Sequence, residues 1–462
     1  MALHAEHSHA AVKISSAIAT TARRQMELGD NPLSLKKLRF NQGLAPYEVS
    51  FIHLLDRISN GTRFKISETG TEVNLIPGAL TGGSVVYSCD KARPLSYYLE
   101  PLLLLAPFCK KPLNLTLKGR LQNDQNGYNS VYKVKHAALP LLEIFGLEPD
   151  LQVTSRSYDE SEIKFTCTVK KQLLTLRSQL SQDCGKVKKV RGLVYGFRVS
   201  PQMLNRIVTS AKGVFLPFLS DVFITSDPVK HSKSKVPGFG LVLYSETTKS
   251  IHCAVDGFVG REKSDESQSI ETKSVTLDLS HESESKQKRK FELFGDNDNE
   301  DDMEQPRKKQ KSNATNIIDG NTDIKKSQEV ILSPEDFGAK IAKQLLKEIA
   351  SKACVDSVYQ WLVLGLMALG PKDVSSVLLG PLTPFTIQYL RDLKIFFGIT
   401  FRIEKHRIDI SPDDEESERK ESRLHKLSCL GSGYVNLNKT MGNITVDTQP
   451  RKGILSLELG YE

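Results

Sequence analysis

The sequence predicts an α+β protein whose helices cover sheets, interrupted by a long charged insertion. Along most of the chain, segments with apolar residues at helical spacing alternate with short segments that have the pattern of strands. Residues 260–330 break this alternation, because they are rich in Glu, Ser, Asp, Lys and Asn and are aromatic only at Phe291 and Phe294. Such a segment buries too little apolar surface to offset its loss of conformational entropy, so we expect it to be disordered.

The first folded stretch, residues 43–119, begins with a helix. Pro46 suits a first helical turn, where its missing N–H is not needed, and apolar residues then recur at helical spacing until Gly61 ends the pattern. The elements expected next are strands over 63–68 and 72–76, a helix over 96–108 and a strand over 113–118. Ahead of this stretch, the pattern predicts a short helix over 14–22 and a strand over 33–40.

Two further groups of elements precede the insertion. The first contains a helix over 132–145, which Gly146 ends, and strands over 151–154 and 162–169. The second contains a strand over 193–199, a helix that starts at Ser200 and Pro201, and strands over 223–225, 239–245 and 251–255. This second group predicts a small α+β domain of its own.

Folded sequence resumes after the insertion with a strong helix start. Ser333 is a preferred N-cap residue, Pro334 follows at the first helical position, and Glu335 and Asp336 place acids in the first turn. The elements expected after this helix are an apolar strand-like run over 359–369, a strand over 374–379, a helix over 385–397 and strands over 399–403 and 431–439.

Composition narrows the classes of protein to which this chain can belong. Its 462 residues are enough for two or more domains, and its net charge of +8 favours a polyanionic partner. The seven cysteines form neither a CxxC pair nor a Cys/His cluster, so we expect reduced thiols in an intracellular protein and no metal site. No segment has the pattern of a membrane span or the apolar core of a signal peptide.

A series of short motifs points to a known family. PYEVSF, ISNG, ETGT, YYLEPLLLLAPFCKKP and LKG follow one another between Lys36 and Gly119. This order resembles the RNA 3′-terminal phosphate cyclase family, and more closely its cyclase-like branch in eukaryotic ribosome assembly. Similar pieces recur over 190–397 and 431–442.

The resemblance implies a large domain of three repeated helix-and-sheet units with one small insert domain. The predicted divisions are repeats one and two over 1–187, the insert domain over 188–259, the disordered insertion over 260–330, the third repeat and closing strand over 331–442, and a C-terminal extension over 443–462.

The residues that the resemblance implies for cyclase chemistry are missing. In the cyclases a His after a Gly-Pro-Leu/Ile-Thr turn is the nucleophile that carries AMP, but here Phe385 follows the turn Gly380–Thr383. The glycine-rich phosphate loops are also lost: none precedes Gly43, and residues 156–162 read RSYDESE, in which carboxylates would repel a phosphate. We therefore expect no cyclase activity and no nucleotide cofactor.

Arg391, Asp392 and Lys394 form the candidate catalytic set. An Arg-Asp-x-Lys set of this kind resembles an RNA-cutting site proposed for the cyclase-like branch, in which Arg and Lys would hold the scissile phosphate while Asp aids a 2′-hydroxyl. The alternative is an ordinary charged face of an amphipathic helix, or a surface that contacts RNA or protein without cutting.

Basic clusters elsewhere favour proximity to RNA. Lys36–Arg39, Lys110–Lys111, Lys186–Arg191 and Arg402–Arg407 would attract backbone phosphates. Aromatic residues interleave poorly with these clusters, so the sequence indicates no stacking platform.

Two basic runs inside the insertion predict a bipartite nuclear localisation signal, although charge blocks of this kind also occur as solvated loops. Its residues are Lys286, Lys288, Arg289, Lys290, Arg307, Lys308, Lys309 and Lys311.

The leading hypothesis is a non-cyclase protein of early pre-ribosomal RNA processing and small-subunit assembly, located in the nucleus and nucleolus. The resemblance implies the small-subunit processome, pre-ribosomal RNA and a large ribosome-assembly GTPase as partners, and the basic loop implies an import receptor. The alternatives are an endoribonuclease that uses Arg391, Asp392 and Lys394, and a divergent ATP-dependent RNA 3′-phosphate cyclase.

Overall fold

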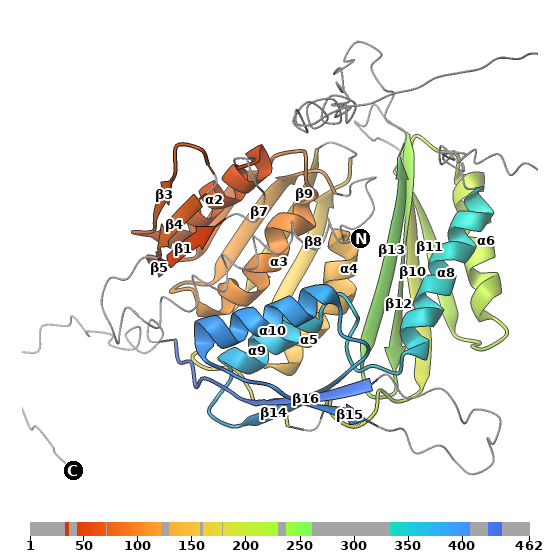
Figure 1. Ribbon diagram of the computed structural model, residues 1–462. Helices are drawn as coiled ribbons and strands as arrows, with labels where there is room; N and C mark the ends of the chain where they lie inside the picture. The colour runs from red at the N-terminus through yellow and green to blue at the C-terminus, as the bar shows by residue number, and fades with distance from the viewer. Residues whose placement is uncertain are drawn as a thin grey trace, which may run out of the picture. The chain divides into compact units, whose positions relative to one another are not determined.

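The computed structural model describes residues 33–36, 44–70, 72–121, 129–157, 160–177, 179–229, 237–260, 333–406 and 424–436 (Figure 1). The predicted helix over 14–22, the predicted disordered insertion after its first residue, Gly260, and the C-terminal extension lie outside these residues; the localisation signal lies within that insertion. Helices and sheets alternate through the described part, so the predicted α+β class is confirmed.

The amino-terminal elements build two small sheets and a larger one. One small sheet has the order β1-β4-β3 and the other pairs β2 with β5, while the larger sheet has the order β6-β7-β9-β8. The strands are β1 (Leu33–Lys36), β2 (Ser59–Asn60), β3 (Arg63–Ile66), β4 (Glu72–Ile76), β5 (Ala79–Leu80), β6 (Gly83–Ser88), β7 (Leu113–Gly119), β8 (Pro149–Ser155) and β9 (Ser161–Cys167). The helices are α2 (Pro46–Ile58), α3 (Leu95–Leu105), η1 (Ala106–Phe108), α4 (Val131–Lys133), η2 (Val134–Ala138) and α5 (Leu139–Ile144).

A second group of elements forms the predicted small α+β domain. Its sheet has the order β11-β10-β12-β13, in which β10 and β11 are parallel and the other neighbours are antiparallel. The elements are β10 (Val187–Phe197), α6 (Pro201–Phe215), β11 (Val222–Val229), β12 (Gly238–Thr247) and β13 (His252–Gly260). Ser200 caps α6 as predicted, because its side chain accepts a hydrogen bond from the N–H of Met203.

Helix α8 (Pro334–Ala350) follows the insertion in sequence but packs on this small sheet. It lies beside α6 on one face of the sheet (Figure 1), and Phe337, Ile341 and Leu345 share one hydrophobic cluster with Ile207 and Leu241. Ser333 caps the helix by accepting from the N–H of Asp336, as the sequence predicts. The predicted division into domains stays a proposal, and this packing favours counting α8 with the insert domain.

The remaining elements form a helix-covered sheet of order β14-β16-β15. They are α9 (Gln360–Leu369), β14 (Val374–Leu379), α10 (Pro384–Phe397), β15 (Arg402–His406) and β16 (Leu424–Leu430). The irregular segment after β9 lies along β14, because the N–H of Ser376 donates to the carbonyl of Leu176 and that of Leu378 to the carbonyl of Leu180. This segment therefore ties the sheet that contains β9 to the sheet that contains β14.

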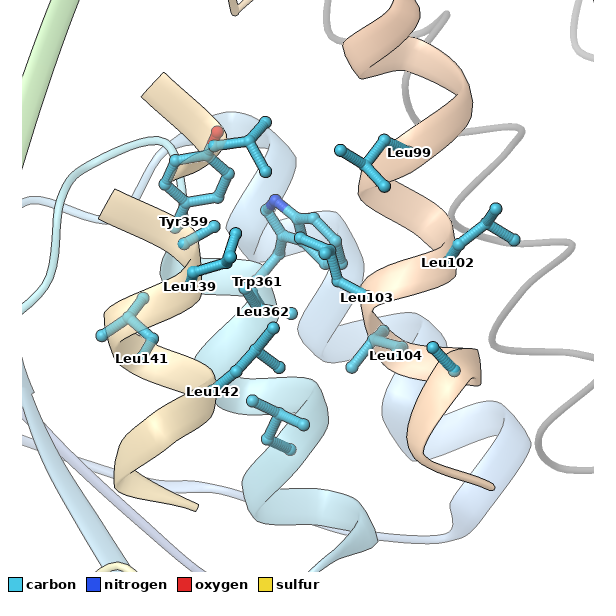
Figure 2. Packing of buried hydrophobic residues seen from close by; sticks show 14 of the residues in the cluster. Leu99, Leu102, Leu103, Leu104, Leu139, Leu141, Leu142, Tyr359, Trp361 and Leu362 are labelled. Carbon is cyan, nitrogen blue, oxygen red and sulfur yellow. The ribbon is translucent and has the colours of Figure 1, made fainter. Parts of the chain in front are cut away.

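The main core forms where helices from distant parts of the chain meet. Figure 2 shows leucines of α3 and α5 packed around Tyr359, Trp361 and Leu362, which lie at or before the start of α9. Every residue of α9 is buried, as is every residue of α3. The burial of these apolar helices is the main source of stability for the large domain.

Two predicted elements are wrong. The apolar run over 359–369 is helix α9 and not a strand, because a short run that is apolar on all sides fits a buried helix as well as a buried strand. The sheet is completed by β16, which the sequence reading missed, while residues 431–436 form no strand. They instead run across the core: Tyr434 packs edge-on against Phe108, and the side-chain amide of Asn436 donates to the carbonyl of Cys109.

Candidate functional site

The amino-terminal end of α10 holds the position where the family resemblance places a nucleophile. Thr383 caps the helix by accepting from the N–H of Thr386 at 3.1 Å, and the Gln360 side chain of α9 accepts from the Thr386 hydroxyl at 2.8 Å. Gln360 also donates to the carbonyl of Pro381 at 3.2 Å. Side chains of α9 thus fix the turn that presents residue 385.

Phe385 itself belongs to an aromatic cluster. Its half-buried ring lies parallel to that of Tyr389 with centroids 6.3 Å apart, and edge-on to Trp361 at 6.5 Å. A hydrocarbon ring has no lone pair that could attack a phosphate, so this position contributes packing in place of covalent chemistry.

The three candidate catalytic residues lie on α10 but do not converge on one point. The side chains of Arg391 and Lys394 are exposed, whereas Asp392 is only 5% exposed. The Asp392 carboxylate accepts a hydrogen bond from the side-chain amide of Gln388 at 3.1 Å, and Arg391 donates to the oxygen of the same amide at 3.4 Å. The structure therefore brings the two cations to the surface together and turns the carboxylate inward.

The loop that replaces the glycine-rich phosphate nest is held by its own side chains. The N–H of Ser157 donates to the hydroxyl of Ser161 at 3.0 Å, and that hydroxyl donates back to the carbonyl of Ser157. Arg156 forms an ion pair with Asp227 on β11 and lies over the ring of Tyr132, 5.6 Å from its centroid. The amide of Ser157 and the cation of Arg156 are thus engaged within the protein; Tyr158 and Asp159 lie outside the described residues.

A buried polar network, which the sequence reading missed, joins residues of α3, α4, β13 and the segment before α9. Lys133 on α4 lies 3.7 Å from the carboxylate of Asp356, and Asp356 also accepts from the N–H of Ala254 on β13. The carboxylate of Glu100 on α3 accepts from Asn129 at 2.8 Å and from the hydroxyl of Tyr359 at 3.3 Å. A sequence signal did exist, because Glu100 is the single acid in an otherwise apolar helix.

Burial and neighbouring charges together set the protonation equilibria in this network. Burial raises the pKa of Glu100 from 4.5 to about 7, although the hydrogen bonds from Asn129 and Tyr359 act in the opposite direction. Burial alone would lower the pKa of Lys133, but the carboxylates around it, with Asp356 first, raise it above its ordinary value. The network is a structural junction with a carboxylic acid that titrates near neutrality.

An open cavity of about 510 Å³ lies elsewhere, between α2 and the end of β6. Val49, His53, Tyr87 and Asp90 are among the residues that line it. Within the described residues, no group of three or more His, Cys, Asp or Glu side chains is placed to hold a metal ion, and none of the helices is long and apolar enough to span a membrane.

Comparison with known proteins decides the family. The family model for RNA 3′-terminal phosphate cyclase matches residues 6–403. The chain belongs to the RNA 3′-terminal phosphate cyclase family. The RNA 3′-terminal phosphate cyclase-like proteins of Mus musculus and Homo sapiens are both 38% identical to it over 424 residues, which cover 90% of this chain and 93% of each relative. Another member, the rRNA processing protein rcl1 of Schizosaccharomyces pombe, is 29% identical over 408 residues, or 86% of this chain and 88% of its own length.

Membership of the cyclase family confirms the resemblance that the short motifs carry. The matched region includes α10 with Phe385 and the exposed pair Arg391 and Lys394. The chain thus matches the family model over most of its length. At position 385, however, an aromatic packing residue lies where the family resemblance implies a nucleophilic His.

Proposed function

We propose that this protein acts in pre-ribosomal RNA processing during assembly of the small ribosomal subunit, and that it does so without cyclase chemistry. The observation that carries the proposal is the packing of Phe385 in a family of RNA 3′-end enzymes. A chain that keeps the family's fold but has no nucleophile at this position suits a binding role. The similarity to the rRNA processing protein of Schizosaccharomyces pombe supplies the RNA class.

The proposed partners follow from the same reading. They are pre-ribosomal RNA, the small-subunit processome and a large assembly GTPase, and the proposed location is the nucleus and nucleolus. An import receptor would bind the basic runs between Lys286 and Lys311, which lie outside the described residues.

Affinity purification of the tagged protein from its own cells tests this function. We expect recovery of a large GTPase, processome components and unprocessed ribosomal RNA. Depletion of the protein should cause the same RNA precursors to accumulate on a northern blot. Recovery of neither the GTPase nor ribosomal precursors would contradict the proposal.

An endoribonuclease is the second candidate, because Arg391 and Lys394 are exposed side by side and could hold a phosphate. The inward position of Asp392 supports contact with RNA or protein over cleavage, since a group that activates a 2′-hydroxyl has to reach it. Replacing all three residues with Ala separates the candidates. An endoribonuclease would lose cleavage of a defined pre-ribosomal RNA and keep its partners; loss of partner binding would instead favour a contact surface.

A further inference from the structure

In the small sheet, aromatic side chains lie beside a basic segment, although they are distant from it in the sequence. Arg191 lies on β10 at the end of the basic segment Lys186–Arg191, and it is the register partner of Phe223 on β11 and of Tyr244 on β12. Register partners project from the same face of a sheet, so these three side chains form a row across it. His136 of η2 extends the row, since its ring stacks on Tyr244 with centroids 3.9 Å apart and an interplanar angle of 5°.

The open end of this row is held in place by charged groups. Phe223 is 58% exposed, and the ammonium group of Lys212 lies over its ring, 5.9 Å from the centroid. Arg191 donates to both carboxylate oxygens of Asp221, at 2.8 and 3.0 Å, which fixes the plane of its guanidinium group. A fixed ring next to a fixed guanidinium plane costs little conformational entropy when a flat ligand stacks on them.

Positive charge surrounds the row. The pKa of Asp221 lies below its ordinary value, first because Arg191 hydrogen-bonds to it and further because Lys189 and Lys188 lie close enough to act on it. Glu246 on β12 also lies beside this segment, and it pairs with Lys189 at 2.6 Å. Lys212 lies over the ring of Phe223, and Lys188 and Lys189 precede Arg191 on β10. Lys135 lies at the other end of the row, where its charge acts on His136.

We propose that this row of Phe223, Arg191, Tyr244 and His136 is a binding site for single-stranded RNA. The cations would attract the phosphates, while an unpaired base stacks on Phe223 and the Arg191 plane. A duplex would not fit this chemistry, because its bases are already stacked on one another. The site adds an RNA-binding surface to the proposed function. The identity of the RNA in cells rests on that proposed function, whereas binding itself is testable with synthetic RNA.

Fluorescence anisotropy with the full chain and a labelled single-stranded RNA of mixed sequence tests the site. Phe223→Ala should weaken binding roughly 5- to 100-fold, the range expected for loss of one base–aromatic stack. Lys188→Ala should weaken binding at low salt and reduce the slope of log affinity against log salt by about 0.7, as one lost phosphate contact does on a single strand.

Phe218→Ala is the matched control. Phe218 is 77% exposed in the same small domain, so the two substitutions remove the same side chain from exposed positions. We expect this variant to bind RNA within about twofold of the unchanged protein. A labelled oligonucleotide of the same length made entirely of abasic sites separates the two kinds of contact: Phe223→Ala should have no effect on its binding, whereas Lys188→Ala should still weaken it.

Several outcomes would overturn the site. The first is an unchanged RNA affinity in Phe223→Ala. The second is a loss of affinity in Phe218→Ala equal to that in Phe223→Ala, and the third is a loss in Phe223→Ala that is as large on abasic RNA as on ordinary RNA. The last two outcomes would indicate a general apolar surface for a protein partner. The test also stands apart from the proposed function. Phe223-dependent RNA binding without recovery of ribosomal precursors from cells would support the site and contradict the proposed cellular role. Recovery of ribosomal precursors without Phe223-dependent RNA binding would support the cellular role and contradict the site.

Discussion

Glu100 is a residue whose behaviour depends on neighbours from two other segments. It lies in the apolar helix α3, and its partners Asn129 and Tyr359 come from before α4 and before α9. Its pKa of about 7 lies above the ordinary 4.5, so the folded protein keeps a proton there that the unfolded chain releases. The contribution of Glu100 to stability is therefore complete below about pH 4.5 and is lost as the pH rises through about 7.

Glu100→Gln should remove this pH dependence, because the amide is neutral throughout. We expect the free energy of unfolding of the unchanged protein, minus that of the variant, to fall by up to about 3 kcal/mol between pH 4.5 and pH 8. Urea unfolding at both pH values measures the difference and cancels the titration of all other groups. A difference that does not change with pH would show that Glu100 titrates as an ordinary carboxyl.

The candidate set on α10 separates into structural and surface residues. Asp392→Ala should lower the free energy of unfolding by about 1–3 kcal/mol, because it removes a buried carboxylate that accepts a hydrogen bond from the half-buried amide of Gln388. Arg391→Ala and Lys394→Ala, at exposed positions, should each change it by less than about 0.5 kcal/mol. Urea unfolding of the three single variants checks this ranking, which a large loss in Lys394→Ala would contradict.

At the scale of elements, the contact between α6 and α8 is close enough to require a glycine. A Cβ atom at Gly338 would lie 2.7 Å from the backbone carbonyl oxygen of Ile207, a distance that Cβ atoms do not adopt. Helix α8 can approach α6 this closely only because residue 338 has no side chain. The packing of these two helices thus joins residues on either side of the insertion.

Gly338→Ala should therefore destabilise the protein by about 1–3 kcal/mol, through the shift needed to relieve the clash. Gly213→Ala is the control on α6, where a Cβ would meet nothing within 4 Å. It should stabilise the protein by about 0.5–1 kcal/mol, since alanine loses less backbone entropy in a helix. Thermal unfolding compares the two variants, and a stabilised Gly338→Ala would mean that the helices are not in close contact.

At the scale of the whole molecule, the described contacts join the two ends of the chain across the insertion. The described residues up to Gly260 and from Ser333 onward belong to one compact unit. The hydrophobic cluster of the insert domain combines Leu241 and Val255 with Ile341 and Leu345 of α8. The stability of this cluster therefore depends on residues from both sides of the insertion.

Replacing residues 263–331 with a Gly/Ser linker of about 15 residues tests this organisation. We expect a melting temperature within about 3 °C of that of the full chain, because the entropy of closing the loop changes slowly with its length. The same variant should fail to enter the nucleus if the basic runs are the import signal, and fluorescence microscopy would show its location. Alanine substitution of the eight basic residues is the control that separates import from loop length. A loss of folding would show that the insertion contributes to the core.

The local patterns of the sequence were reliable where a chemical signal marked the start of a helix. Ser200 and Ser333 cap α6 and α8 as predicted, because capping is an interaction within four residues of chain. The run over 359–369 was assigned wrongly, since an element buried on all sides has no amphipathic period to reveal its type.

The sequence by itself determined the α+β class, the family and the absence of a nucleophile at Phe385, because local patterns and motifs specify each of these. Only the tertiary structure decided that Asp392 faces inward, that Glu100 shares a buried network with Lys133 and Asp356, and that Phe223 and Tyr244 flank Arg191. Those facts depend on the pairing of strands and the packing of helices that lie far apart in the chain. Such contacts leave no periodic pattern in a single sequence.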